Sequence, residues 1–158
     1  MSSSVHIFMS TGLAPSEAAQ QLATAFGVEP VESDGSVYVA VRSDNAEAGG
    51  EVMRNIYGAP PDPEPDEISV MDGYDIAWEI RRIPSDEDAR GTAGRQLFDE
   101  IIERLQLSAL LVDSFSTLVA AWRPVVGLTD FPAGASPDAD DQELWRSYAI
   151  AVEPYPHA

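Results

Sequence analysis

Residues 74–81 read YDIAWEIR, and their pattern decides the fold class. Large apolar side chains occupy every second position, from Tyr74 to Ile80, and smaller or polar side chains fill the positions between them. A period of two is typical of a β-strand that buries one face and exposes the other. Pro84 ends the pattern, because proline cannot donate to a strand ladder. We therefore expect a half-buried strand over 74–81.

The residues after this strand predict a helix and two further strands. From about Thr92, apolar side chains recur at helical spacing and share one stripe; they are Leu97, Phe98, Ile101, Ile102 and Leu105. Two apolar runs of strand length follow, over 107–112 and 117–122. The predicted order is β-α-β-β over 74–123.

The same order is predicted nearer the N-terminus, over 5–42. Val5–Met9 is rich in strand formers and is expected to be buried on both faces. Pro15 suits the first turn of an amphipathic helix, and Asp34-Gly35 favours a tight hairpin turn between two extended segments. The repeated order suggests an internal duplication. We expect an α+β fold, with a mainly antiparallel sheet and two helices on one face.

One stretch has the composition of a domain linker. Residues 59–67 read APPDPEPDE, which favours a stiff, extended segment. The chain has 158 residues, and domains usually span about 100–200 residues. We therefore predict a single α+β domain over 1–158, whose halves 1–58 and 68–158 are joined by this linker.

The segments outside the repeat have weaker patterns. A short helix is expected within 46–57, and residues 124–138 have a loop-like composition. A helix is expected from Asp138 to Trp145, followed by a final strand over 147–152. Residues 154–158 are expected to form a loose tail.

An acidic excess dominates the composition. The chain has 27 Asp and Glu residues against nine Arg and no Lys, for a net charge of −18. Such a surface repels nucleic acids and anionic membranes, whereas it attracts a basic protein. The alternative is that the acidity serves only solubility. Because no secretory signal and no membrane-length apolar stretch occurs in the sequence, we expect a cytoplasmic protein.

The residue types exclude several kinds of site. No cysteine is present, which excludes a thiolate zinc site and a cysteine nucleophile. No lysine is present, which excludes a P-loop and a Schiff base. His6 lies in a predicted buried strand, where a hydrogen-bonded structural role is favoured over a catalytic one, and His157 lies in the predicted tail. We therefore expect no cofactor and no catalytic residue.

Acidic residues gather at two predicted helix starts. Asp138, Asp140 and Asp141 resemble a cluster of oxygen ligands for calcium or magnesium. They lack the glycine and glutamate spacing of an EF-hand loop, and acidic residues are common at helix starts because they complement the helix dipole. Capping is the favoured interpretation, with an all-carboxylate metal site as the alternative.

Seven residues are candidate contacts for a basic partner. Carboxylates form charge-assisted hydrogen bonds with arginine and lysine, and a tryptophan beside charged residues can anchor an interface. A core position is the alternative interpretation for each tryptophan. The candidates are Asp86, Glu87, Asp88, Asp138, Asp140, Asp141 and Trp145.

Several stretches carry a family resemblance: LAPSEAA at 13–19, LFDEI at 97–101, and ALLVD at 109–113 before LVA at 118–120. In these stretches, and in size, acidity and lack of a catalytic motif, the chain resembles the small acidic immunity proteins of bacterial polymorphic toxin systems. It also resembles uncharacterised actinobacterial α+β proteins. The first resemblance implies a non-catalytic bacterial protein that neutralises a basic toxin by covering its active site. It implies no site residues.

Two other functions stay open. One is a structural or regulatory α+β module that forms a homodimer through an open sheet edge. The other is an enzyme that uses carboxylates, either with a metal or as acid and base. Nothing in the sequence selects one carboxylate pair for such chemistry.

Overall fold

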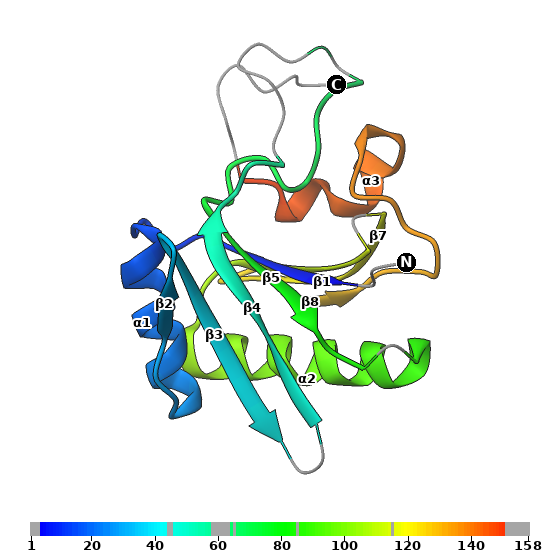
Figure 1. Cartoon of the computed structure of the whole chain (residues 1–158). Coiled ribbons are helices and arrows are strands. Elements are labelled where there is room, and N and C mark those ends of the chain that lie inside the picture. The colour runs from blue at the N-terminus through cyan, green and yellow to red at the C-terminus, as the bar shows by residue number, and fades with distance from the viewer. Residues whose placement is uncertain are drawn as a thin grey trace.

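One antiparallel sheet of eight strands organises the chain in this computed structural model (Figure 1). The strand order is β2-β3-β4-β5-β1-β6-β7-β8, and every pairing is antiparallel. The strands are β1 (Val5–Met9), β2 (Val31–Ser33), β3 (Ser36–Ser43), β4 (Ala46–Arg54), β5 (Ile76–Arg82), β6 (Ala109–Asp113), β7 (Thr117–Arg123) and β8 (Gly127–Asp130). The structure describes residues 4–43, 46–57, 64, 66–84, 86–114 and 116–150.

Two helices, α1 (Pro15–Phe26) and α2 (Glu87–Leu105), cover one face of this sheet. One apolar stripe of each helix, which includes Leu22 in α1 and Phe98 in α2, packs against inward side chains of the strands such as Trp78. The predicted α+β class, with a mainly antiparallel sheet and two helices on one face, is confirmed.

The helix starts follow from local chemistry. Pro15 stands in the first turn of α1, where its missing N–H has no partner to lose. Helix α2 begins at Glu87, earlier than the expected start near Thr92. The carboxylate of Asp86 caps it by accepting a hydrogen bond from the N–H of Ala89 at 2.9 Å.

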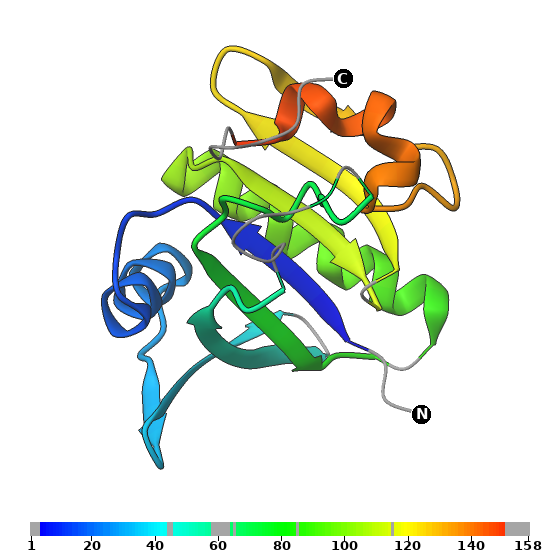
Figure 2. The same ribbon diagram turned by 90° about the horizontal axis from the view of Figure 1, so that it is seen from above.

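A second layer covers part of the opposite sheet face. It comprises the turns over 66–75 and the segment 131–150, which contains η1 (Ala139–Asp141), α3 (Gln142–Trp145) and η2 (Arg146–Tyr148). Apolar side chains of this layer pack on β1, β5, β6 and β7 in a second core cluster. Figure 2 shows the orange and red segment over the yellow strands, with β2 and β3 extending away from it.

The second layer determines which strands are buried on both faces. Every residue of β1 is buried, as predicted for 5–9. In β5, Ala77 and Glu79 are buried along with their larger neighbours, so the expectation of a half-buried strand is wrong there. The second layer covers the face that the sequence pattern leaves open. In β3 the alternation persists, with Val39 buried and Tyr38 exposed.

Strand β4 replaces the helix that we expected within 46–57. Its two glycines allow close approach to neighbouring strands, because a Cβ on Gly50 would lie 1.7 Å from the carbonyl oxygen of Glu79. The register with β5 shifts between Gly49 and Gly50. The glycine pair that weakens a helix is therefore suited to this irregular strand.

The C-terminal segment departs most from expectation. Strand β8 lies within 124–138, which was expected to be a loop. The helix expected from Asp138 to Trp145 is divided into η1 and α3, and residues 147–148 of the expected final strand lie in η2. The side chains of Trp145 and Tyr148 are buried, and their packing on the sheet takes precedence over local periodicity.

Strands from both sides of the predicted linker interleave in the sheet. Strand β1 lies between β5 and β6. The chain passes from α1 to the edge strand β2 and returns inward, whereas it passes from α2 to β6 and continues outward to β8. The two β-α-β-β segments therefore do not form a structural repeat. Residues 59–63 and 65 of the linker, and the predicted tail over 154–158, lie outside the described residues.

Candidate functional site

A groove lies on the sheet face opposite the helices, over β3, β4 and the adjoining part of β5. No segment among the described residues covers this region, which we call the uncovered half-sheet. The groove has a volume of about 650 Å³. Its lining includes Val31, Tyr38, Gly50, Glu51, Glu79 and Arg81.

A row of directly paired residues crosses the uncovered half-sheet. Val31 of β2 pairs with Tyr38 of β3, which pairs with Glu51 of β4. Glu51 in turn pairs with Glu79 of β5, and Glu79 with His6 of β1. Because paired residues point to the same face, the row leads from exposed apolar side chains to a buried polar group.

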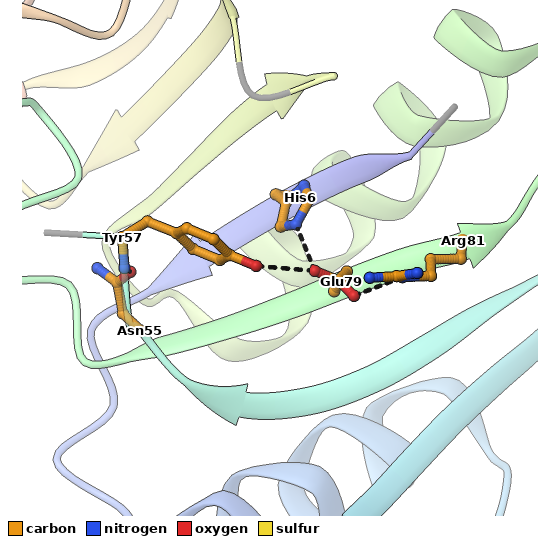
Figure 3. Close-up of polar contacts among 5 residues, drawn as sticks. All are labelled: His6, Asn55, Tyr57, Glu79 and Arg81. Atoms are coloured by element: carbon orange, nitrogen blue, oxygen red, sulfur yellow. Dashed lines mark hydrogen bonds and ion pairs between the residues drawn. The ribbon is translucent and has the colours of Figure 1, made fainter. Parts of the chain in front are cut away.

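The buried end of the row is a cluster around the carboxylate of Glu79 (Figure 3). One oxygen, Oε2, lies 3.1 Å from Nε2 of His6 and accepts the hydroxyl hydrogen bond of Tyr57 at 2.9 Å. The other, Oε1, accepts from Nε of Arg81 at 2.6 Å. An ionised carboxylate can only accept hydrogen bonds, so Nε2 of His6 carries the proton in this contact. We call these four residues the Glu79 cluster.

The segment after β4 positions Tyr57 in the Glu79 cluster. The side-chain amide of Asn55 donates to the carbonyl oxygens of Met71 and Tyr74, each at 2.8 Å. Its own oxygen accepts from the N–H of Tyr57 at 2.9 Å. Asn55 therefore joins the end of β4 to the second layer and holds the tyrosine at the border of the uncovered half-sheet.

The environment of the Glu79 cluster shifts the pKa values of its members. Burial tends to raise the pKa of Glu79, but hydrogen bonds from Arg81, His6 and Tyr57 outweigh it and hold that pKa below its ordinary value. Burial lowers the pKa of His6, against the opposing effect of Glu79. Burial and the hydrogen bond to Glu79 raise the pKa of Tyr57 to about 12. At neutral pH the cluster contains a carboxylate, a neutral imidazole and a phenol.

The Glu79 cluster is suited to holding side chains in place. A general acid or base works best when its pKa lies near the operating pH, and the pKa of Glu79 lies well below that. Its carboxylate already accepts three hydrogen bonds. Within the described part of the chain, no group of three or more potential ligands is placed to hold a metal ion. The arrangement therefore orients Tyr57 and Arg81 beside the groove.

The candidates Asp86, Glu87 and Asp88 lie exposed at the start of α2. Asp86 caps the helix, and the other two stand in its first turn, where they complement the helix dipole. The three acidic side chains lie in the helical layer, which the sheet separates from the uncovered half-sheet. They are therefore not part of the groove.

The candidates Asp138, Asp140 and Asp141 lie in the second layer, across the sheet from α2. Asp141 accepts a hydrogen bond from the N–H of Ser136 at 2.6 Å, and Asp140 is exposed. The structure therefore does not bring the two acidic groups together in one site.

Trp145 does not form a surface anchor, so that candidate contact is corrected. Its side chain has 0% exposure, and its indole N–H donates to the carbonyl oxygen of Asp138 at 3.0 Å. The apolar residues around it belong to the second core cluster. The alternative core interpretation holds for this tryptophan.

The residues of the groove were not among the sequence candidates. Alternation in β3 marks Tyr38 as outward-facing, so this residue was recognisable from the pattern. Glu51 was not recognisable from the sequence pattern, because its segment was expected to be a helix. The juxtaposition of Glu51 and Glu79 depends on strand register, which periodicity alone does not specify.

Comparison of the chain with protein-family models, with curated proteins and with solved structures found no match. None of the helices in the described ranges combines the length and apolar character needed to cross a bilayer.

Proposed function

We propose that the protein is a non-catalytic binding protein that takes up a basic protein partner on the uncovered half-sheet and neutralises it. The observation that carries the proposal is a groove bordered by exposed apolar side chains on a chain of net charge −18. Protein interfaces combine aromatic anchors with charged groups at their rims. A cationic partner would be steered toward this molecule by its field.

The ion pairs support a net negative surface. Six arginines form ion pairs with the protein's own carboxylates: Arg42, Arg81, Arg82, Arg90, Arg95 and Arg104. These cations are therefore locally compensated, while acidic side chains such as Glu87, Asp88 and Asp140 are exposed to solvent. The surplus charge that a partner meets is carboxylate.

The apolar part of the proposed surface is a cross-strand pair. Val31 and Tyr38 lie directly opposite each other, with 60% and 39% of their surfaces exposed. Exposed apolar side chains that adjoin a groove are typical of binding surfaces. Burial of this pair by a partner would add an apolar contribution to the electrostatic attraction.

A toxin enzyme is the kind of basic partner that we propose. The resemblance to acidic immunity proteins supports this choice, since such proteins neutralise a basic toxin by covering its active site. Carboxylates of the binding protein would form charge-assisted hydrogen bonds with arginine or lysine side chains of the toxin. The protein would then act in the cytoplasm of a bacterium.

Affinity capture tests the proposal. The tagged full chain is incubated with extract of its source organism at low and moderate salt, and retained proteins are identified by mass spectrometry. We expect one basic protein near stoichiometric amounts, shed as salt rises, whose own activity is inhibited by the purified chain. Failure to retain any basic protein would contradict the proposal.

Matched valine variants locate the surface. Val31→Ser changes the uncovered half-sheet, and Val126→Ser changes an exposed valine in the β7–β8 turn. We expect Val31→Ser to weaken binding to the captured protein and Val126→Ser to leave it unchanged. Equal effects of the two variants would place the interface elsewhere.

A further inference from the structure

Two glutamates face each other across neighbouring strands in the groove. Glu51 of β4 pairs directly with Glu79 of β5, and like charges in this position are unfavourable. Glu79 is compensated by His6, Tyr57 and Arg81. Glu51 is half-buried, and no hydrogen bond or ion pair to it occurs among the described residues. The groove therefore contains one carboxylate whose oxygens can still accept hydrogen bonds from an incoming group.

The arginines near the groove already have partners. Arg81 binds Glu79 at 2.6 Å, and Arg82 and Arg42 both bind Glu47, at 2.5 and 3.6 Å. Glu47 lies four residues from Glu51 on β4, which is about 13 Å along an extended strand. That separation exceeds the Debye length of about 8 Å at physiological salt. Arg42 and Arg82 are therefore held away from Glu51. Arg81 lies close enough to attract Glu51 electrostatically, but its guanidinium is hydrogen-bonded to Glu79, so no arginine among the described residues forms an ion pair with Glu51.

An exposed aromatic ring stands beside this carboxylate. Tyr38 is the direct cross-strand partner of Glu51 on β3, on the same face of the sheet. A cation over an aromatic ring gains a cation–π attraction and can pair with an adjacent carboxylate at the same time. Ala40, Gly49 and Gly50 line the groove with small side chains or none, which leaves room for an incoming side chain.

We infer that the groove binds an arginine side chain of the partner, with its guanidinium between the ring of Tyr38 and the carboxylate of Glu51. This inference rests on the proposed function and names the chemistry of the contact. A planar guanidinium stacks on an aromatic ring and forks onto a carboxylate, whereas a compact ammonium is more strongly hydrated and has no flat face. The combination of ring and carboxylate therefore favours arginine over lysine.

A small probe tests the contact without the partner. The ¹⁵N-labelled full chain is titrated with N-acetyl-arginine amide, and backbone chemical shifts are followed by NMR. We expect saturable shifts centred on Tyr38 and Glu51, with binding about tenfold weaker for the lysine analogue. The citrulline analogue has the same shape without the charge, and we expect no saturable shift from it.

Two variants and one control assign the residues. Glu51→Gln and Tyr38→Ala should each weaken binding of the arginine probe at least about tenfold. A well-dispersed NMR spectrum of each variant serves as the check that the variant is folded. Glu32→Gln, which changes an exposed glutamate of β2, should leave binding unchanged. Shifts spread over many carboxylates, equal binding of the lysine analogue, or binding that survives Glu51→Gln would overturn the inference.

The outcomes separate this inference from the proposed function. Capture of a basic protein that depends on Val31, together with no response to the arginine probe, would overturn the arginine contact and leave the binding function standing. A saturable arginine site without any captured basic protein would support the contact and contradict the neutralising function.

Discussion

Two halves of one sheet face differ in what covers them. On β1, β6 and β7, the face opposite the helices is packed under the second layer, so side chains such as Phe8 and Leu110 are fully buried. On β2 and β3, the same face exposes Val31 and Tyr38. The strands of both halves are rich in β-formers. The covering segments, and not the strands alone, therefore determine where a core ends and a surface begins.

The border between the two halves is polar. Glu79 lies on β5, where the second layer ends, and its carboxylate is satisfied by His6, Tyr57 and Arg81. A buried charge is tolerated only when hydrogen bonds and opposite charge compensate it. The Glu79 cluster thus marks the edge of the covered half and leaves the adjacent Glu51 facing the groove.

The largest expected effect contrasts the two halves directly. Trp145→Ala should lower the free energy of unfolding by about 3–5 kcal/mol, because it leaves a cavity under the second layer. Tyr38→Ala on the uncovered half-sheet should lower the free energy of unfolding by less than about 1 kcal/mol, since substitutions at the surface rarely lower it by more. Urea unfolding of both variants measures this. Similar losses would mean that the uncovered half is also packed.

The next effect concerns the strand that joins the halves. Gly50→Ala should lower the free energy of unfolding by about 1–3 kcal/mol, because its Cβ would overlap the backbone of β5 at Glu79. Gly91→Ala is the control, because a Cβ added at Gly91 would meet no atom within 4 Å. Alanine in a helix is more stable than glycine by about 0.5–1 kcal/mol, so this variant should be slightly stabilised. The midpoint temperature of thermal unfolding should fall for Gly50→Ala and rise for Gly91→Ala. An unchanged midpoint for Gly50→Ala would contradict the close approach of β4 to β5.

A smaller effect is pH-dependent and arises at the border. The folded pKa of His6 lies below its ordinary 6.5, so the unfolded chain binds the proton first and stability falls as pH drops below about 6.5. The folded pKa of Glu79 lies below its ordinary 4.5, so a further loss follows below about pH 4.5. Both contributions are fully present at neutral pH.

Two histidine variants test that assignment. Urea midpoints of the wild type, His6→Gln and His157→Gln are compared between pH 8 and pH 5. His6→Gln should lose part of the decline between pH 6.5 and 5, whereas His157→Gln should retain it. Each unit of difference between the pKa of a group in the folded state and its pKa in the unfolded state changes the free energy of unfolding by about 1.4 kcal/mol. An unchanged decline in His6→Gln would assign the titration to other groups.

The smallest effect concerns the facing glutamates. Glu51→Gln should raise the free energy of unfolding by about 0.2–1 kcal/mol, because it removes a like charge opposite Glu79. Glu32→Gln, on the exposed edge strand, should change it less. High salt should reduce the difference between wild type and Glu51→Gln. A destabilised Glu51→Gln would show instead that attraction to Arg81 outweighs the repulsion.

Local patterns predicted much of the architecture. The first strand, the helix that begins at Pro15 and the turn at Asp34-Gly35 follow from apolar spacing, a helix-start proline and a turn dipeptide. In that turn both residues have positive φ, at 53° and 83°, as a tight hairpin requires. These features depend on neighbours in the chain, so they could be recognised without knowing the fold.

The candidate site was less accessible to sequence reasoning. The acidic clusters at helix starts were prominent in the sequence, yet they lie in separate layers. Glu51 lies in a segment that was predicted to be a short helix. The glycines of this segment favour neither a helix nor a regular strand, so the sequence did not indicate that Glu51 lies on a strand. Trp145 stands between charged neighbours in sequence but packs in the core in space.

Sequence alone determined the acidic charge and the absence of lysine and cysteine, and it predicted the α+β class, because composition and short-range periodicity are properties of the chain. The tertiary structure decided that β4 is a strand, that Trp145 is core, and that Glu51 faces Glu79 beside an open groove. These depend on strand register and on which distant segment covers which face, since a pairing shifted by one residue would turn every side chain to the other side.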